Sequence, residues 1–265
     1  MKLKSVLLLI ALNLFVLNSF GAVCEDENFS THVSGESQCL VMRQYGSGAP
    51  EVMVVWLHGD VSTGGPANYH FRDAERFSRE RYADKVISVA LVRPGYEDGA
   101  GNKSTVAFFH SARTDHYTKV NLIEVGTAIE RLKEKFKPKR VVVVGHSGGA
   151  VTFAALLGIK PDLADAAVLV GCACDFEVWR AGRRPLALSE NPMKWVASIN
   201  INTRVIALTG ELDDNTFPRN VESYVAALQG RKIDAEFRLL GGYGHNESFR
   251  SPEVFRAVQS LLTAK

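Results

Sequence analysis

The chain has 265 residues, of which 46% are apolar and 23% are charged, a composition ordinary for a globular protein with one sizeable domain. Its 31 basic and 29 acidic side chains leave a formal net charge of +2. That balance gives no electrostatic reason to expect nucleic acid or an anionic membrane surface as a partner. No internal repeat or low-complexity linker divides the sequence.

Residues 1–21 have the layout of a secretory signal peptide. Two lysines near the start precede an apolar run from Val6 to Phe20, and the small residues Gly21 and Ala22 follow it. This run is shorter than the roughly 20 residues that a membrane-spanning helix needs, although an uncleaved anchor is the alternative. We therefore predict cleavage after Gly21 or Ala22 and an exported protein, periplasmic or secreted, without stable membrane insertion.

Export makes disulfides the natural interpretation of the four cysteines. Cys24 and Cys39 both precede the first strong strand, and we expect them to pair. For Cys172 and Cys174 a strained bridge, two buried thiols and pairing with the first two all remain open. Lipidation of Cys24 is disfavoured because Val23 stands where lipoprotein signals usually have a small residue. No metal site is expected, since no nearby His or Cys supplies the remaining ligands.

Short apolar runs rich in β-branched residues alternate with longer amphipathic stretches along residues 22–265. Four consecutive valines are typical of a central parallel strand buried on both faces. The alternation predicts a single α/β domain, with a mostly parallel sheet covered by helices on both faces. Strands are predicted over Val52–His58, Val86–Val92, Val141–Val144, Ala166–Val170, Arg204–Leu208 and Ala235–Leu240, and helices over Asp115–Phe136, Pro218–Gln229 and Pro252–Leu262.

The sequence Gly-His-Ser-Gly-Gly at 145–149 joins the four valines to a helix rich in Ala and Leu. A G-x-S-x-G motif between a strand and a helix indicates a nucleophile elbow, in which a strained turn presents the serine. The first N–H groups of the helix then face the place where negative charge develops. Ser147 is therefore the candidate nucleophile.

From about Val52 to its C-terminus the chain resembles the α/β-hydrolase superfamily, both serine esterases and prolyl-oligopeptidase-like hydrolases. The resemblance implies a three-layer α/β-hydrolase fold in which an acid and a base follow the serine, each after a later strand. Asp213 matches the position of the acid, three residues after Gly210, and Asp214 is its near competitor. His245 matches the base, at the end of a glycine-rich loop after the last strand.

The resemblance also implies an oxyanion hole, formed by the backbone N–H groups of Gly148 and Asp60. A carboxylate at Asp60 departs from the family, which often has a small or apolar side chain there. It either turns away into a hydrogen bond or helps to select a cationic substrate. Arg-Pro-Gly-Tyr at 93–96 matches a loop that borders the active site. Residues from about 175 to 202 occupy the cap position, too short a segment for a large lipid-binding lid.

The leading hypothesis is a serine hydrolase that cleaves small or medium soluble carboxylic esters through an acyl-enzyme intermediate, without a cofactor. An exported peptidase or aminopeptidase of the same fold is the alternative, so the partner is a small ester or a short peptide. A non-catalytic binding protein that reuses the fold is a third possibility. The order Ser, Asp, His counts against it, because a binding protein has no need of all three.

Overall fold

The computed structural model describes residues 23–46, 48–62, 64–79, 84–107 and 117–263. The predicted signal peptide lies outside these residues. Within them, no helix is both long and apolar enough to cross a bilayer.

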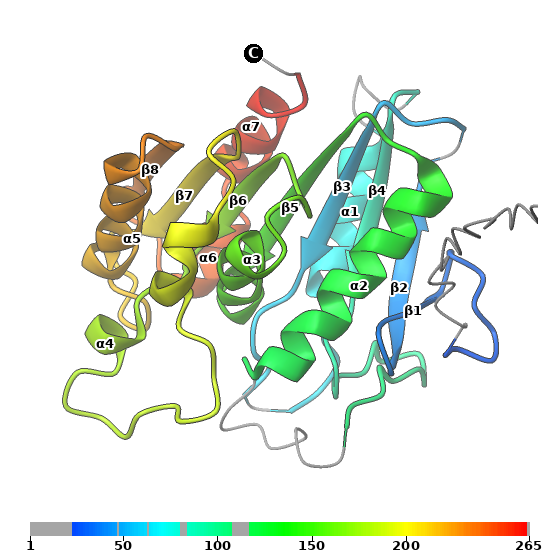
Figure 1. Cartoon of the computed structure of the whole chain (residues 1–265), viewed down its shortest axis with the longest axis horizontal. Helices are drawn as coiled ribbons and strands as arrows, with labels where there is room; N and C mark the ends of the chain where they lie inside the picture. Colours follow the sequence, from blue (N-terminus) through cyan, green and yellow to red (C-terminus); the bar gives the residue numbers. More distant parts are fainter. Residues whose placement is uncertain (1–22, 47, 63, 80–83, 108–116, 264–265) are drawn as a thin grey trace, which may run out of the picture.

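A central sheet organises the described part of the chain (Figure 1). Its strand order is β1-β2-β4-β3-β5-β6-β7-β8. The strands from β4 to β8 in this order are parallel to their neighbours. The strand β2 is antiparallel to both of its neighbours, β1 and β4. All six predicted strands are present, and two further strands, β1 and β2, extend the sheet at one edge. The strands are β1 (His32–Ser34), β2 (Cys39–Tyr45), β3 (Val52–Leu57), β4 (Val86–Leu91), β5 (Arg140–His146), β6 (Ala166–Val170), β7 (Arg204–Gly210) and β8 (Asp234–Leu240).

Helices cover both faces of the sheet, which confirms the predicted three-layer α/β architecture (Figure 1). On one face lie α2 (Lys119–Phe136), α3 (Gly148–Ile159) and α5 (Pro218–Gly230). On the other face lie α1 (Tyr69–Ser78), α6 (His245–Phe249) and α7 (Pro252–Ser260). The short helix α4 (Phe176–Trp179) and the 3₁₀ helix η2 (Pro192–Ser198) belong to a small cap segment, residues 175–202.

Of the helix predicted over Asp115–Phe136, residues 115 and 116 lie outside the described part of the chain. The helix α2 begins at Lys119, where the Thr118 side chain caps it by accepting a hydrogen bond from the Asn121 N–H. At α7 the predicted start is present: the Ser251 hydroxyl accepts from Glu253 N–H and Pro252 is the first helical residue.

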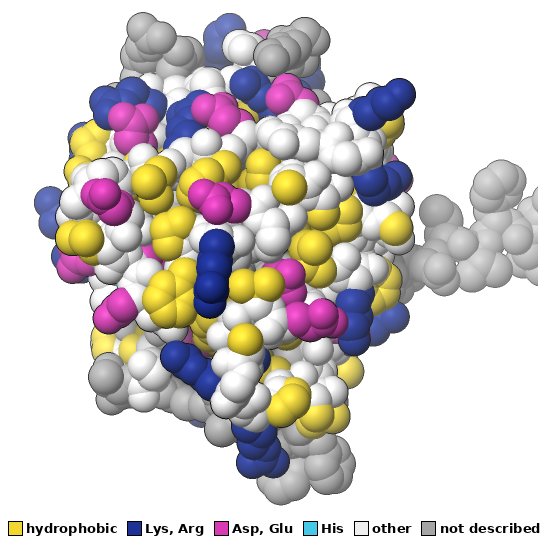
Figure 2. Space-filling model, turned by 90° about the vertical axis from the view of Figure 1, so that its left-hand side faces the viewer, with side chains coloured by type: hydrophobic (Ala, Val, Ile, Leu, Met, Phe, Trp, Pro, Cys, Tyr) yellow, Lys and Arg dark blue, Asp and Glu magenta, His cyan; other side chains and the backbone are white. Residues whose placement is uncertain are grey.

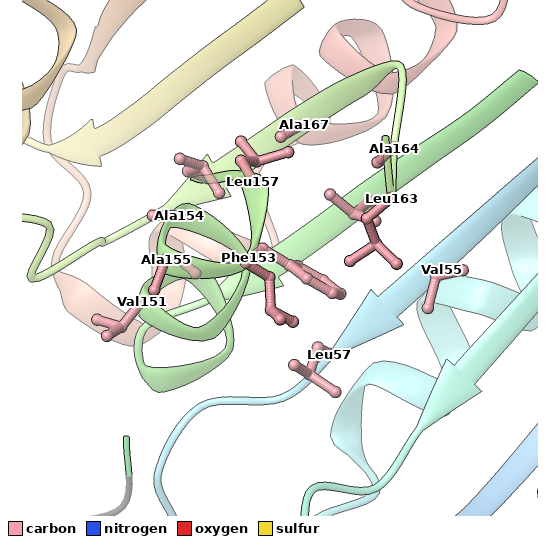
Figure 3. Packing of buried hydrophobic residues seen from close by; sticks show 14 of the residues in the cluster. Val55, Leu57, Val151, Phe153, Ala154, Ala155, Leu157, Leu163, Ala164 and Ala167 are labelled. Carbon is pink, nitrogen blue, oxygen red and sulfur yellow. The ribbon is translucent and has the colours of Figure 1, made fainter. Parts of the chain in front are cut away.

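Each face of the sheet has its own hydrophobic cluster. In β5, Val141 and Val143 pack with α2, α3 and α5, while Val142 and Val144 pack with α1 and α7. This alternation explains the four-valine run, because successive side chains of a strand point to opposite faces and both faces here are buried. Figure 3 shows the first of these clusters, where Phe153 of α3 reaches toward the strand that carries Val55 and Leu57.

Two disulfides are present. Cys24 is bonded to Cys39, as expected, which joins the start of the described chain to β2. Cys172 is bonded to Cys174. Of the arrangements that the sequence left open, a bridge between these two cysteines is therefore the one present. The second disulfide is buried directly after β6.

Candidate active site

Ser147 lies in the sharp turn between β5 and α3. Its φ of 50° and ψ of −117° belong to a region that residues with a side chain rarely occupy. Its backbone N–H donates to the Val170 carbonyl oxygen at the end of β6, 2.8 Å away. A Cβ at Gly149 would lie 2.6 Å from the His58 carbonyl oxygen, so a glycine lets α3 approach the end of β3. The local sequence therefore provides both the turn and the room for it.

The structure brings Ser147, His245 and Asp213 together, each just after the carboxyl end of a parallel strand. His245 Nε2 lies 3.0 Å from Ser147 Oγ, and His245 Nδ1 lies 2.8 Å from Asp213 Oδ2. Because an ionised carboxylate only accepts hydrogen bonds, Nδ1 carries the proton and Nε2 accepts the serine hydroxyl. Such an arrangement can transfer the hydroxyl proton to the imidazole as the oxygen attacks.

Asp213, and not Asp214, faces the histidine. Asp213 is buried, and its carboxylate also accepts from the N–H groups of Asn215 and Thr216 and from the Thr216 hydroxyl. Burial raises the pKa of Asp213, but His245 and the Thr216 donors outweigh it and hold that pKa below its usual value. Asp214 is exposed. Asp213 thus caps the local turn with one oxygen and contacts His245 with the other.

A buried network behind Ser147 was not predicted from the sequence. The Gly59 N–H donates to the Tyr69 hydroxyl over 2.6 Å, and this hydroxyl donates to His146 Nδ1, also over 2.6 Å. His146 Nε2 then donates to the His245 carbonyl oxygen over 3.2 Å. Burial lowers the pKa of His146 to about 3, so the ring is neutral, and one of its nitrogens accepts a hydrogen bond while the other donates one. The network connects the loop before Asp60, the turn of Ser147 and the loop of His245.

The Asp60 side chain lies in a polar cluster beside Gly148. Its carboxylate lies 2.7 Å from Arg93 Nη1 and accepts from the hydroxyls of Tyr117 at 2.6 Å and Tyr96 at 3.3 Å. A Cβ at Gly148 would lie within 3 Å of the polar atoms of Asp60, Arg93 and Tyr117, so a side chain there would displace this cluster. The Arg93 side chain is only 4% exposed, and it offsets the Asp60 carboxylate charge beside the start of α3. Of the two alternatives expected for the Asp60 side chain, the structure shows the one in which it forms hydrogen bonds.

The cap segment borders the site on two sides. The Trp179 indole donates to the Asn215 carbonyl oxygen over 2.9 Å, and the Asn215 amide lies 3.3 Å from His245 Nε2. On the other side the Phe176 ring lies 5.7 Å from the ring of Tyr117, which bonds Asp60. No motif in the sequence marked Tyr117 or Asn215, because their roles depend on contacts between distant segments.

In the described part of the chain, no group of three or more His, Cys, Asp or Glu side chains is arranged to hold a metal ion.

Known proteins share this architecture. The sequence profile of the alpha/beta hydrolase family matches residues 54–229. A Caenorhabditis elegans protein named dipeptidyl peptidase family member 1 is 22% identical over 213 residues, which make up 75% of this chain and 26% of that protein. The chain therefore spans about a quarter of the length of this curated relative.

Two solved structures illustrate the structural likeness. Esterase PE8 superposes with a TM-score of 0.60 and 20% identity, over 87% of this chain and 97% of that one. An acylaminoacyl peptidase superposes with a TM-score of 0.67 and 13% identity, over 88% of this chain and 41% of that one. At these identities the likeness shows the fold alone. The family profile covers more than half of the sequence, and the sheet and its helical layers agree with it: the chain belongs to the alpha/beta hydrolase family.

Proposed function

We propose that this protein is a serine hydrolase that cleaves small or medium-sized soluble carboxylic esters through an acyl-enzyme intermediate. In this proposal Ser147 attacks the carbonyl carbon and His245 takes the serine proton and passes it to the leaving group. Asp213 orients the imidazole and stabilises its cation. The backbone N–H groups of Gly148 and Asp60 bind the oxyanion.

One observation carries the proposal. A continuous chain of hydrogen bonds runs from Ser147 Oγ through both nitrogens of His245 to Asp213, with lengths of 3.0 and 2.8 Å. It begins at a serine held in a strained turn at the start of a helix. A protein that only binds a ligand has no use for this combination, and we therefore favour catalysis over a non-catalytic role.

The ester and peptide alternatives share this machinery. The name of esterase PE8 supports the ester, and the names of the acylaminoacyl peptidase and the dipeptidyl peptidase relative support peptide cleavage. Those two peptidases are much longer than this chain, which covers 41% and 26% of them. The cap segment, residues 175–202, is small and leaves room for a small substrate rather than a long one. We therefore place the ester first and peptidase activity second.

The test is a panel of chromogenic esters and matched aminoacyl anilides given to the purified mature protein. We expect hydrolysis of at least one small ester, and a loss of about 10⁴-fold or more in Ser147→Ala. Circular dichroism of the variant controls for folding. Cleavage of the anilides with no cleavage of the esters would select the peptidase, and a Ser147→Ala variant that keeps a tenth of the activity would exclude this nucleophile.

We also propose that the protein is exported. The signal-like residues 1–21 motivate this, and the two disulfides suit an oxidising compartment. Fractionation of cells that express the full chain, with N-terminal sequencing of the mature form, tests it.

A further inference from the structure

A cavity of 380 Å³ lies within the cap segment, outside the hydrogen-bonded groups described above. Apolar side chains of Phe176, Pro185 and Leu186 line part of it. Phe176 also contacts Tyr117, which bonds Asp60 in the loop of the proposed oxyanion hole. The cavity is thus separated from the reacting groups by a short series of direct contacts.

Three cationic side chains converge on this cavity: Arg180, Arg183 and Lys194. A single carboxylate, that of Glu177, also lines it, so the cations are in excess by two. Lys and Arg side chains also lie at the lower end of the face drawn in Figure 2, the end where Figure 1 places α4. Arg180 is partly buried, whereas Arg183 and Lys194 are exposed.

Among the residues that the structure describes, none of these three cations forms an ion pair. The Arg180 guanidinium donates to the carbonyl oxygen of Arg184 over 3.0 and 2.8 Å, which fixes its position without neutralising it. Like charges gathered in one cavity repel one another, and a bound anion removes that repulsion. Arginine provides paired donors that match the two oxygens of a carboxylate.

We propose that this cavity is a substrate subsite for a carboxylate, so that the preferred substrates are esters that carry a free carboxylate. This inference rests on the proposed hydrolase function and adds a substrate class to it. The apolar lining accommodates the carbon chain between the carboxylate and the scissile group.

The test compares matched substrates with and without the charge. One pair is 4-nitrophenyl butyrate and mono-4-nitrophenyl succinate, which places the carboxylate on the acyl side. The other is phenyl acetate and 4-carboxyphenyl acetate, which places it on the leaving group. We expect the charged member of at least one pair to have a kcat/KM at least tenfold higher, and this preference to weaken as salt is raised.

Two double variants separate local recognition from overall charge. Arg183→Gln with Lys194→Gln removes two charges at the cavity, and the preference for the charged ester should fall about tenfold. Lys85→Gln with Lys139→Gln removes two exposed charges before β4 and β5, at the opposite end of the parallel strands, and should leave the preference unchanged.

The outcomes are distinct for the two proposals. If the wild-type protein cleaves the neutral esters but shows no preference for a carboxylate, the subsite is wrong and the hydrolase function stands. Equal effects of the two double variants on the preference would likewise reject the subsite, because the overall electrostatic field of the protein would then explain the preference. If no ester of either kind is cleaved, the proposed ester hydrolysis fails and the subsite fails with it.

Discussion

At the scale of single residues, the site depends on side chains whose partners are fixed by the turns after β5 and β7. Asp213 and Asp214 are adjacent, yet only Asp213 reaches the His245 ring. The reason is the turn after β7, in which the N–H groups of Asn215 and Thr216 hold the Asp213 carboxylate inward.

Asp213→Asn should therefore lower turnover by orders of magnitude while the fold persists, because an amide favours the wrong histidine tautomer and does not stabilise the imidazolium. Asp214→Asn, one residue away and exposed, is the matched control and should change turnover little. Both are measured on one good ester, with circular dichroism for folding. If Asp214→Asn is inactive and Asp213→Asn is active, the acid is Asp214 and not Asp213.

The Tyr69 hydroxyl joins the loop before Asp60 to the end of β5. Tyr69→Phe leaves the Gly59 N–H and His146 Nδ1 without their shared partner. Because Gly59 precedes the residue proposed for the oxyanion hole, we expect kcat to fall by about tenfold with little change in KM, together with a stability loss of about 1–3 kcal/mol.

Tyr224→Phe provides the control for this variant. It also removes a buried tyrosine hydroxyl, which bonds the Ala154 carbonyl oxygen between α5 and α3, away from the loops of the site. Its stability should fall to a similar extent and its kcat should not. If both variants lose kcat equally, the Tyr69 hydroxyl stabilises the fold as a whole and does not position the loops of the site.

Residues of the site differ in how far the sequence reveals them. Ser147, Asp213 and His245 were predicted because each follows a recognisable strand, in the order that the family resemblance implies. Tyr69 and His146 were not predicted as a pair, since nothing local distinguishes a tyrosine that bonds a distant histidine from one that packs in a core. The two side chains meet only once α1 is packed on the sheet near the end of β5.

At the scale of elements, the buried parallel strands were predicted and the peripheral elements were missed. β3, β5 and β6 are buried on both faces, so their apolar runs are continuous. β1 has only three residues, and in β2 the apolar run ends at Met42, before the partly buried polar residues Arg43 and Gln44. The helix α1 buries few residues among many charged ones, and its amphipathic pattern is short.

The disulfide between Cys24 and Cys39 acts on an element at the edge of the sheet. It closes a loop with a sequence separation of 15, and β2 is separated from β5, the strand before Ser147, by β4 and β3. Replacing both cysteines by alanine should lower the free energy of unfolding by about 3 kcal/mol, the entropy expected for such a loop.

Ester turnover at 25 °C should stay near that of the wild type in this variant, because the loop is remote from the site in the sheet. Urea unfolding and steady-state kinetics measure the two quantities. Unchanged stability, or recovery of Cys24 and Cys39 as free thiols in the wild-type protein, would contradict the assigned role.

At the scale of the whole molecule, buried histidines make stability depend on pH. Burial lowers the pKa of His70 and of His146 to about 3, and that of His58 well below its usual value. These rings are neutral when the protein is folded, whereas in the unfolded chain they take up protons below about pH 6.5. Their contribution is complete above pH 6.5 and is lost progressively as the pH falls toward 3.

The free energy of unfolding should therefore fall by up to about 1.4 kcal/mol per pH unit for each such histidine between pH 6 and 4.5. The carboxyl of Asp73 acts in the opposite direction, because burial raises its pKa to about 6, but it is one group against three. Urea unfolding at pH 7.5, 6 and 4.5 measures the slope. A stability that is flat or rises over this range would contradict the burial of neutral histidines.

The nucleophile can be identified directly from the residue that an organophosphonate inhibitor modifies. A fluorophosphonate reacts with a serine only when a base activates its hydroxyl and an oxyanion site stabilises the product. Incubation of the purified protein, followed by digestion and mass spectrometry, should find one adduct, on Ser147, formed as ester hydrolysis is lost. His245→Ala should abolish the labelling. An adduct on another serine, or complete loss of hydrolysis without modification of Ser147, would contradict the assignment of the nucleophile.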